Sequence, residues 1–159
     1  MNSPTHALAL DTPLGTLVLG ACDDALTRVW LANEAPPADV RSLASSRVLE
    51  DAARQLAEYF AGQRRRFDLD LRAEGTTFQR SVWEQLSLID YGDTITYGEL
   101  AARVSRPRAY RAVGQANGAN PLPIVVPCHR VLASTGIGGY AGGLETKRAL
   151  LALEDRHVN

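Results

Sequence analysis

Short, mainly hydrophobic runs separated by polar and turn residues occur along the first third of the chain, a pattern typical of antiparallel strands. The runs lie at 7–10, 16–20 and 26–31, with a turn between the first two, and the last is enriched in β-branched and aromatic residues. From residue 48 to residue 62 the apolar positions recur at helical spacing instead. The first third is therefore predicted to form a small antiparallel sheet covered by one helix.

Beyond this helix, the alternating segment 67–71 predicts an edge strand. Thr76–Thr77 then provides helix-capping residues, and apolar residues at helical spacing continue to about Ile89. The change of pattern predicts a domain boundary here. We expect an N-terminal α/β lobe over 1–73 and a second lobe over 76–159.

The second lobe has a mainly helical pattern. Short helices are expected at 97–104 and from Pro107 to Ala116, and a last helix at 146–155. Two short helices with a tight link are typical of a helix-turn-helix, although such pairs also occur in proteins that do not bind DNA. The expected fold class is α+β: a small antiparallel-sheet lobe, and a mainly helical lobe that carries a winged helix-turn-helix.

Charge is divided unevenly along the chain. Residues 1–97 hold nine arginines and 14 carboxylates, whereas residues 98–159 hold eight basic and four acidic residues. The C-terminal part is therefore the one suited to phosphate, with expected contacts at 103–111 and 147–148 and salt-sensitive binding. The chain has no run of about 18 apolar residues and no basic or apolar leader, so we expect a cytoplasmic protein that does not bind membranes.

The two cysteines, Cys22 and Cys128, lie far apart without a CxxC spacing, which argues against a disulfide framework or a zinc knuckle. Cys128 ends an apolar, β-rich stretch from 120 to 127 and is followed directly by His129. An imidazole near a thiol can take its proton, directly or through a water molecule. Because neighbours in an extended segment point to opposite faces, we favour the water bridge. The alternative is an inert core cysteine.

A histidine that acts as a base normally needs a third group to orient its ring. The carboxylates of the last third of the chain are Glu99, Glu145, Glu154 and Asp155. Of these, Glu154 lies in the last predicted helix and can face the core behind His129.

Glycines cluster between residues 136 and 143 around Tyr140. Such a segment is either an ordinary mobile loop or a place where backbone closely approaches a planar ligand. It contains no nucleotide-binding motif, so no cofactor is expected.

Four segments in order carry a resemblance to a known family: Arg111-Ala112-Val113-Gly114, Asn120-Pro121, Pro127-Cys128-His129-Arg130-Val131 and Tyr140-Ala141-Gly142-Gly143-Leu144. Over about residues 77–154 the chain resembles the O6-alkylguanine-DNA alkyltransferases, also called methylated-DNA-protein-cysteine S-methyltransferases, and the N-terminal lobe resembles their smaller domain more loosely. The resemblance implies DNA repair by irreversible, single-turnover transfer of an alkyl group from O6-alkylguanine or O4-alkylthymine in double-stranded DNA to a cysteine. The implied protein is a monomer without a cofactor.

The resemblance also implies catalytic roles, residue by residue. Cys128 is the implied alkyl acceptor, His129 its water-relayed base, and Glu154 the partner that holds the imidazole. Asn120 is expected to brace the turn that bears the cysteine. Tyr97 is expected to crowd the phosphate at the target and to donate a hydrogen bond to the purine.

DNA contacts are implied on the second helix of the pair, which this family offers to the minor groove. Arg111 is the implied side chain that enters the base stack and fills the gap left by the extruded nucleotide. The other implied DNA contacts are Arg108, Tyr110, Ala112 and Gly114, and the implied pocket residues for the flipped base are Val131, Tyr140, Ala141 and Lys147.

The chain departs from the family at three places. Tyr110 stands where a small residue is more usual, Ala141 stands where some members have serine, and the loop from Cys128 to Tyr140 is one residue shorter than in relatives. Some members hold zinc in the N-terminal lobe, but here that lobe offers only Cys22 and His6, so no metal is expected.

Two other functions fit part of the pattern. A binding module that flips a base and recruits repair factors would need no acceptor, and the presence of Cys128 argues against it. A cysteine hydrolase or peptidase usually takes its histidine from a distant segment, but His6 and His157 lie near the ends of the chain.

Overall fold

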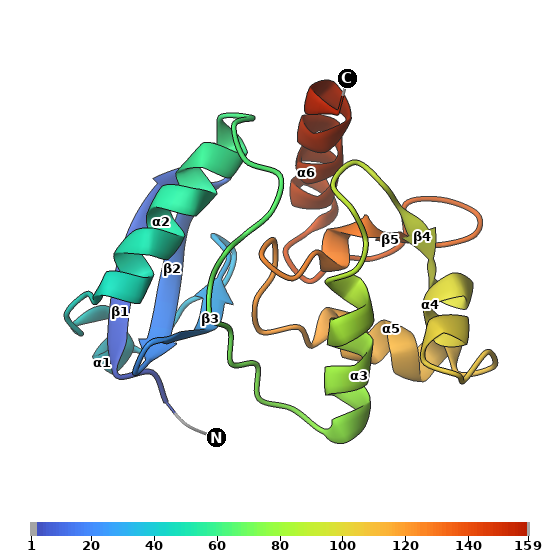
Figure 1. Ribbon diagram of the computed structural model, residues 1–159, viewed down its shortest axis with the longest axis horizontal. Coiled ribbons are helices and arrows are strands. Elements are labelled where there is room, and N and C mark those ends of the chain that lie inside the picture. The colour runs from blue at the N-terminus through green and yellow to red at the C-terminus, as the bar shows by residue number, and fades with distance from the viewer. Residues whose placement is uncertain (1–2, 159) are drawn as a thin grey trace. The chain divides into compact units, whose positions relative to one another are not determined.

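A three-stranded antiparallel sheet forms the centre of the N-terminal unit. The computed structural model of the chain describes residues 3–158 and separates into one unit ending at Glu74 and another beginning at Gly75. In the first unit β1 (His6–Thr12), β2 (Gly15–Cys22) and β3 (Ala25–Trp30) pair in the order β1-β2-β3 (Figure 1). The three predicted strands are confirmed.

Helix α2 (Arg47–Phe60) lies across one face of this sheet (Figure 1). Its fully buried side chains recur at helical spacing: Leu49, Ala52, Leu56 and Tyr59. The predicted helix is confirmed, and Gly62 follows it in the left-handed region, with φ +76°, as helix-ending glycines commonly do. A single helical turn, α1 (Ala38–Arg41), lies between β3 and α2.

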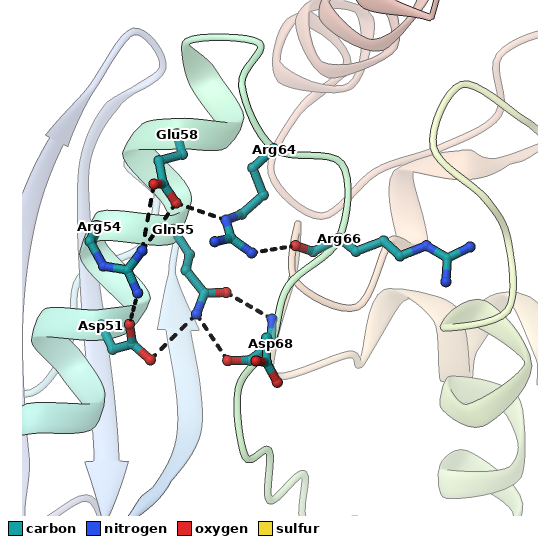
Figure 2. Close-up of polar contacts among 7 residues, drawn as sticks. All are labelled: Asp51, Arg54, Gln55, Glu58, Arg64, Arg66 and Asp68. Carbon is teal, nitrogen blue, oxygen red and sulfur yellow. Dashed lines mark hydrogen bonds and ion pairs between the residues drawn. The ribbon is translucent and has the colours of Figure 1, made fainter.

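The predicted edge strand at 67–71 is wrong. Among residues 3–158 this segment pairs with the sheet at one point, a parallel bridge between Leu71 and Leu26. Asp68 is held instead by Gln55 of α2, whose side-chain amide donates to the Asp68 carbonyl at 2.9 Å and accepts from the Asp68 N–H at 2.8 Å (Figure 2). A buried side chain thus satisfies backbone groups that a neighbouring strand would otherwise pair.

Helix α3 (Thr77–Leu86) begins the second unit with a capping box. The Thr76 hydroxyl accepts from the Gln79 N–H at 3.1 Å, and the Gln79 side chain accepts from the Thr76 N–H at 2.9 Å. The helix ends at Leu86, three residues before the predicted Ile89.

Two short helices follow, α4 (Tyr97–Arg103) and α5 (Tyr110–Gly118). The predicted start of the second helix at Pro107 is wrong, because Pro107 lies in a turn that the Ala109 N–H closes onto the Arg106 carbonyl at 2.9 Å. The buried indole N–H of Trp83 on α3 donates to the Ala116 carbonyl of α5 at 2.8 Å and joins the two helices.

The remaining elements complete the second unit. Strand β4 (Ile95–Thr96) pairs in parallel with β5 (Val131–Leu132), which directly follows a single 3-10 turn, η1 (Cys128–Arg130). Helix α6 (Leu144–His157) covers the predicted last helix and extends it at both ends. The predicted α+β fold is confirmed. Between residues 3 and 158 no helix is both long and apolar enough to cross a membrane.

We expect Gln55→Ala to lower the free energy of unfolding of the N-terminal unit by about 1–3 kcal/mol, because two backbone groups of Asp68 lose their partner beside a buried position. Urea unfolding followed by circular dichroism measures this loss, and hydrogen exchange of the β2 amides assigns it to this unit. The matched control is Arg54→Ala on the same helix, which breaks only exposed ion pairs (Figure 2). An equal loss in both variants would contradict the prediction.

Candidate functional site

A tight turn, and not the predicted extended segment, leads into Cys128. The predicted β-rich stretch at 120–127 is wrong, since the described chain there makes only one bridge, between Pro123 and Val126. The Asn120 side chain donates to the Val126 carbonyl at 2.8 Å and accepts from the Leu122 N–H at 3.0 Å. One buried amide therefore replaces the ladder of a strand, in a segment whose prolines lack the N–H groups that a strand requires.

The thiol of Cys128 is buried at the first residue of η1. Asn117 of α5 donates to the Cys128 carbonyl at 3.3 Å and fixes the backbone of this residue. Burial raises the pKa of the Cys128 thiol, while hydrogen bonds from Asn120 and Tyr140 and the charge of Lys147 oppose the increase. A thiol in this position needs a base to become a nucleophile.

His129, the next residue of η1, is fully buried and is held by one carboxylate. Its Nε2 lies 2.6 Å from the Glu154 Oε2 of α6. Because an ionised carboxylate only accepts, Nε2 carries the hydrogen and Nδ1 presents a lone pair. Nδ1 has no hydrogen-bond partner among residues 3–158. Burial lowers the pKa of His129, against the opposing effect of Glu154, so the ring is neutral and able to accept a proton.

Glu154 binds a second partner that the sequence analysis did not identify. The Arg130 guanidinium donates from Nε to Oε1 at 2.8 Å and from Nη2 to Oε2 at 3.0 Å, and the Gly92 N–H donates to Oε1 at 3.3 Å. Burial alone would raise the pKa of Glu154, but the hydrogen bonds and positive charges of His129 and Arg130 outweigh it and lower the pKa to about 2. The carboxylate is therefore ionised across the physiological range.

Lys147 lies on α6 two turns before Glu154 and faces the thiol side of the site. Its ammonium donates to the Val131 carbonyl at 2.7 Å and to the Gly139 carbonyl at 2.9 Å. Burial lowers its pKa to about 8, although the nearby Cys128 acts to raise it. The expectation that Lys147 contacts phosphate is wrong, because the side chain is fully buried. It ties the glycine-rich loop to β5 instead.

Tyr97, the first residue of α4, lies between the buried site and the surface. Its ring is packed against two glycines: a Cβ on Gly138 would lie 3.1 Å from the ring, and one on Gly114 would lie 4.0 Å from it. Burial raises the pKa of Tyr97, and the nearby Cys128 adds to the increase, so the hydroxyl keeps its hydrogen and can donate it.

The remaining implied DNA contacts lie on or beside the outer face of α5. Arg111 and Ala112 are exposed, Gly114 is half-buried, and Arg108 is exposed in the turn before the helix. Tyr110 begins the helix with 57% of its surface exposed, and its ring lies 3.9 Å from the place of a Cβ on Gly98. These positions form a largely exposed surface that carries two arginines and one tyrosine.

The structure thus gathers the predicted residues into two sets. The first is buried and contains Cys128, His129, Glu154, Asn120, Lys147 and Val131. The second is exposed and contains Arg108, Tyr110, Arg111 and Ala112. Tyr97, Gly114 and Tyr140 are partly buried, whereas Ala141 is exposed in the glycine-rich loop.

Sequence reasoning missed Arg130 and Asn117. Arg130 stands directly after His129, so its place in the quoted motif was a signal that it belongs to the site. Asn117 lies four residues after Val113 on the buried side of α5, where a polar residue normally has a specific partner.

Both halves of the sequence match models of one protein family. Residues 77–156 match the 6-O-methylguanine DNA methyltransferase DNA binding domain, and residues 7–73 match the ribonuclease-like domain of the same family. The two matches follow one another along the chain.

Relatives of similar length support these matches. The chain is 45% identical over 150 residues to a methylated-DNA–protein-cysteine methyltransferase of Mycolicibacterium paratuberculosis, covering 93% of this chain and 91% of the relative. It is 41% identical over 152 residues to the Methanosarcina barkeri protein of that name, covering 94% and 96%. The crystal structure of Mycobacterium tuberculosis OGT in complex with DNA is 41% identical with a TM-score of 0.88, covering 96% of this chain and 94% of that one.

The ion pairs of Glu154 should make the second unit sensitive to acid. Its folded pKa of about 2 lies below the ordinary 4.5, so the stability it contributes is present above pH 4.5 and is lost as the pH falls through about 2. We expect a loss of about 3 kcal/mol over this window from this group. Urea unfolding at a series of pH values, followed by hydrogen exchange of the α6 amides, measures it.

Glu154→Gln should flatten this pH dependence. Glu145→Gln, which changes an exposed carboxylate at the start of the same helix, is the matched control and should follow the wild type. The prediction fails if the two variants lose stability in parallel between pH 4.5 and pH 2.

Proposed function

This chain belongs to the 6-O-methylguanine DNA methyltransferase family, and from this we propose that it repairs double-stranded DNA by moving an alkyl group from O6 of guanine, or O4 of thymine, onto its own Cys128. The observation that carries the proposal is the free acceptor nitrogen of His129. The ring is buried at the residue that directly follows Cys128, and its other nitrogen is bonded to Glu154 at 2.6 Å.

The proposed reaction is an in-line displacement at carbon. The Cys128 thiol gives its proton to His129 Nδ1 through a water molecule, and the sulfur attacks the alkyl carbon. The carbon–sulfur bond forms as the carbon–oxygen bond breaks, and the bonding electrons stay on the base oxygen. The base then takes up the proton that His129 received, and the Tyr97 hydroxyl, which keeps its hydrogen, supports this step by donating a hydrogen bond to the purine. The product is a thioether, which does not return the alkyl group, so each molecule acts once.

The damaged base has to leave the duplex to reach a buried thiol. This requirement gives the exposed residues on and beside α5 their proposed role. We propose that α5 enters the minor groove, where Ala112 and Gly114 let its backbone approach closely. Arg111 fills the gap left by the extruded base and offsets part of the few kcal/mol that flipping costs. Tyr110 packs against the opened strand, and Arg108 contacts phosphate. The DNA complex of the Mycobacterium tuberculosis relative supports this choice of partner.

The glycine-rich loop and β5 would receive the flipped base. Val131, Tyr140 and Ala141 form the proposed pocket, and Lys147 fixes its shape by bonding the carbonyls of Val131 and Gly139. Residues 76–159 are the proposed DNA-binding and transfer domain. We propose a monomer that uses no cofactor and works in the cytoplasm, where cysteines remain reduced.

The first prediction for this function concerns mass. After incubation with a duplex that carries one O6-methylguanine, the intact wild-type protein should gain one methyl group, mapped to the peptide of Cys128 and saturating at one per molecule. Cys128→Ala should gain nothing, because the nucleophile is missing. Cys22→Ser, which removes the other buried thiol, is the matched control and should react as wild type does. Tight binding to the lesion without a mass change would make this a recognition protein instead.

A second prediction separates base extrusion from chemistry. Arg111→Ala should slow methyl transfer from the duplex by about tenfold or more, because the gap in the base stack is no longer filled. Tyr110→Ala should slow it less, while Tyr110→Phe keeps the ring and should react as wild type does. Single-turnover transfer rates measure these effects. In all three variants the rate of Cys128 alkylation by iodoacetamide, which needs no DNA, should be unchanged; a slower iodoacetamide reaction would assign these residues to the thiol site.

A further inference from the structure

Arg130 joins Glu154 to a second segment of the buried site. Besides its two bonds to Glu154, it donates from Nη1 to the Ile89 carbonyl at 2.6 Å, and its guanidinium carbon lies 5.7 Å from the centre of the Tyr91 ring. Only 6% of its surface is exposed. The guanidinium that binds the Glu154 carboxylate is thus held in place by the segment that connects α3 to β4.

We propose that Arg130 is a positioning residue for alkyl transfer: it holds both oxygens of Glu154 and balances their charge, so that the His129–Glu154 pair carries a single proton and His129 Nδ1 remains an acceptor. This role rests on the proposed function, in which Nδ1 receives the proton of Cys128. It goes beyond the role of Glu154, because it names the group that decides where the proton of the pair resides.

The balance of charge among three buried groups determines where the proton resides. With Arg130, the ionised Glu154 and a neutral His129, the three groups sum to zero. Without the guanidinium, a buried carboxylate would face His129 with no cation bonded to it, and a buried charge of this kind takes up a proton. The proton would give either an imidazolium or a neutral Glu154 that donates to Nε2 and forces the hydrogen onto Nδ1. In both states Nδ1 bears a hydrogen and cannot accept another.

Other charged groups near His129 do not replace Arg130. The charges that act on the ring come from Glu154 and Lys147 on α6 and from Arg130 on its own turn, and the neighbouring titratable group is Cys128. Lys147 faces the thiol side, where its ammonium binds two carbonyl oxygens. The groups that lower the pKa of Glu154 are His129 and Arg130. Arg130 therefore acts on the carboxylate directly, whereas Lys147 does not.

The test detects directly which ring nitrogen of His129 carries a proton. NMR ring-nitrogen chemical shifts of His129 distinguish a protonated from an unprotonated Nδ1, and they need no DNA. At neutral pH the wild type should show Nδ1 unprotonated and Nε2 protonated. Arg130→Met should show Nδ1 protonated, and its methyl transfer from an O6-methylguanine duplex should fall by about tenfold or more, since a general base is lost. Arg156→Met, which removes an exposed arginine of α6, is the matched control and should change neither reading.

Two further variants separate charge from geometry. Arg130→Lys keeps the charge but not the planar fork, so Nδ1 should stay unprotonated while transfer slows. The double variant Arg130→Met/Glu154→Leu removes both charges together and adds no donor toward Nε2, so its His129 ring should be neutral. If Arg130→Met does not fold, the double variant must recover both the fold and a neutral ring.

The outcomes decide the proposal independently of the overall function. An unprotonated Nδ1 in Arg130→Met, or a double variant whose His129 ring is protonated at both nitrogens, overturns the role of Arg130 even if the wild type transfers methyl groups. Conversely, a wild type that transfers no methyl group while Nδ1 responds to Arg130 as expected would refute the proposed function and leave the proton assignment standing.

Discussion

The buried carboxylate of Glu154 is the constraint on which the second unit depends. Removing a carboxylate from water costs several kcal/mol unless cations and N–H groups surround it. His129, Arg130 and the Gly92 amide meet this requirement from two other segments of the chain, so satisfying one charge fixes the catalytic turn, the loop before β4 and the last helix together. Because Lys147 lies seven residues before Glu154 on the same buried stripe, the register of one helix also places the cation that ties the glycine-rich loop to β5.

The fold was predictable where the deciding contacts are local. The helical spacing over α2 and the capping threonine at 76 depend on residues within one or two turns, and both helices lie where the sequence predicts them. The strand expected at 67–71 fails because Gln55, 13 residues before Asp68, takes the backbone bonds. The helix expected from Pro107 starts later because Pro107 lies in a turn closed by the Ala109 N–H and the Arg106 carbonyl. In the first failure a contact from outside the local pattern decides the outcome, and in the second a local turn takes the residues that the helix pattern includes.

The residues of the candidate site differ in how far their roles could be predicted from the sequence. Cys128 and His129 are conspicuous, since a cysteine beside a histidine at the end of an apolar stretch is an unusual pair in a core. Glu154 was one of four carboxylates; its place in the last predicted helix favoured it, and the resemblance to a family supported the choice. Arg130 was visible as part of a motif, but its partnership with Glu154 spans 24 residues and depends on how α6 is turned, which no local pattern contains. The burial of Lys147 is of the same kind, because a lysine is normally expected at the surface.

The same network explains why His129 can accept a proton from Cys128 and then release it. Before reaction the charges of Glu154 and Arg130 cancel, and burial favours a neutral His129. When the ring takes the proton of Cys128, it becomes a cation beside a carboxylate whose charge Arg130 already balances, and the negative charge that compensates it is on the sulfur. Transfer of the alkyl group removes that negative charge, because a thioether is neutral, and the imidazolium is then the uncompensated group in the pocket. The departing base carries the new negative charge, so passing the proton to it restores neutrality on both sides. Because the site is buried and its charges balance before reaction, it favours release of the proton from His129 and opposes a lasting imidazolium.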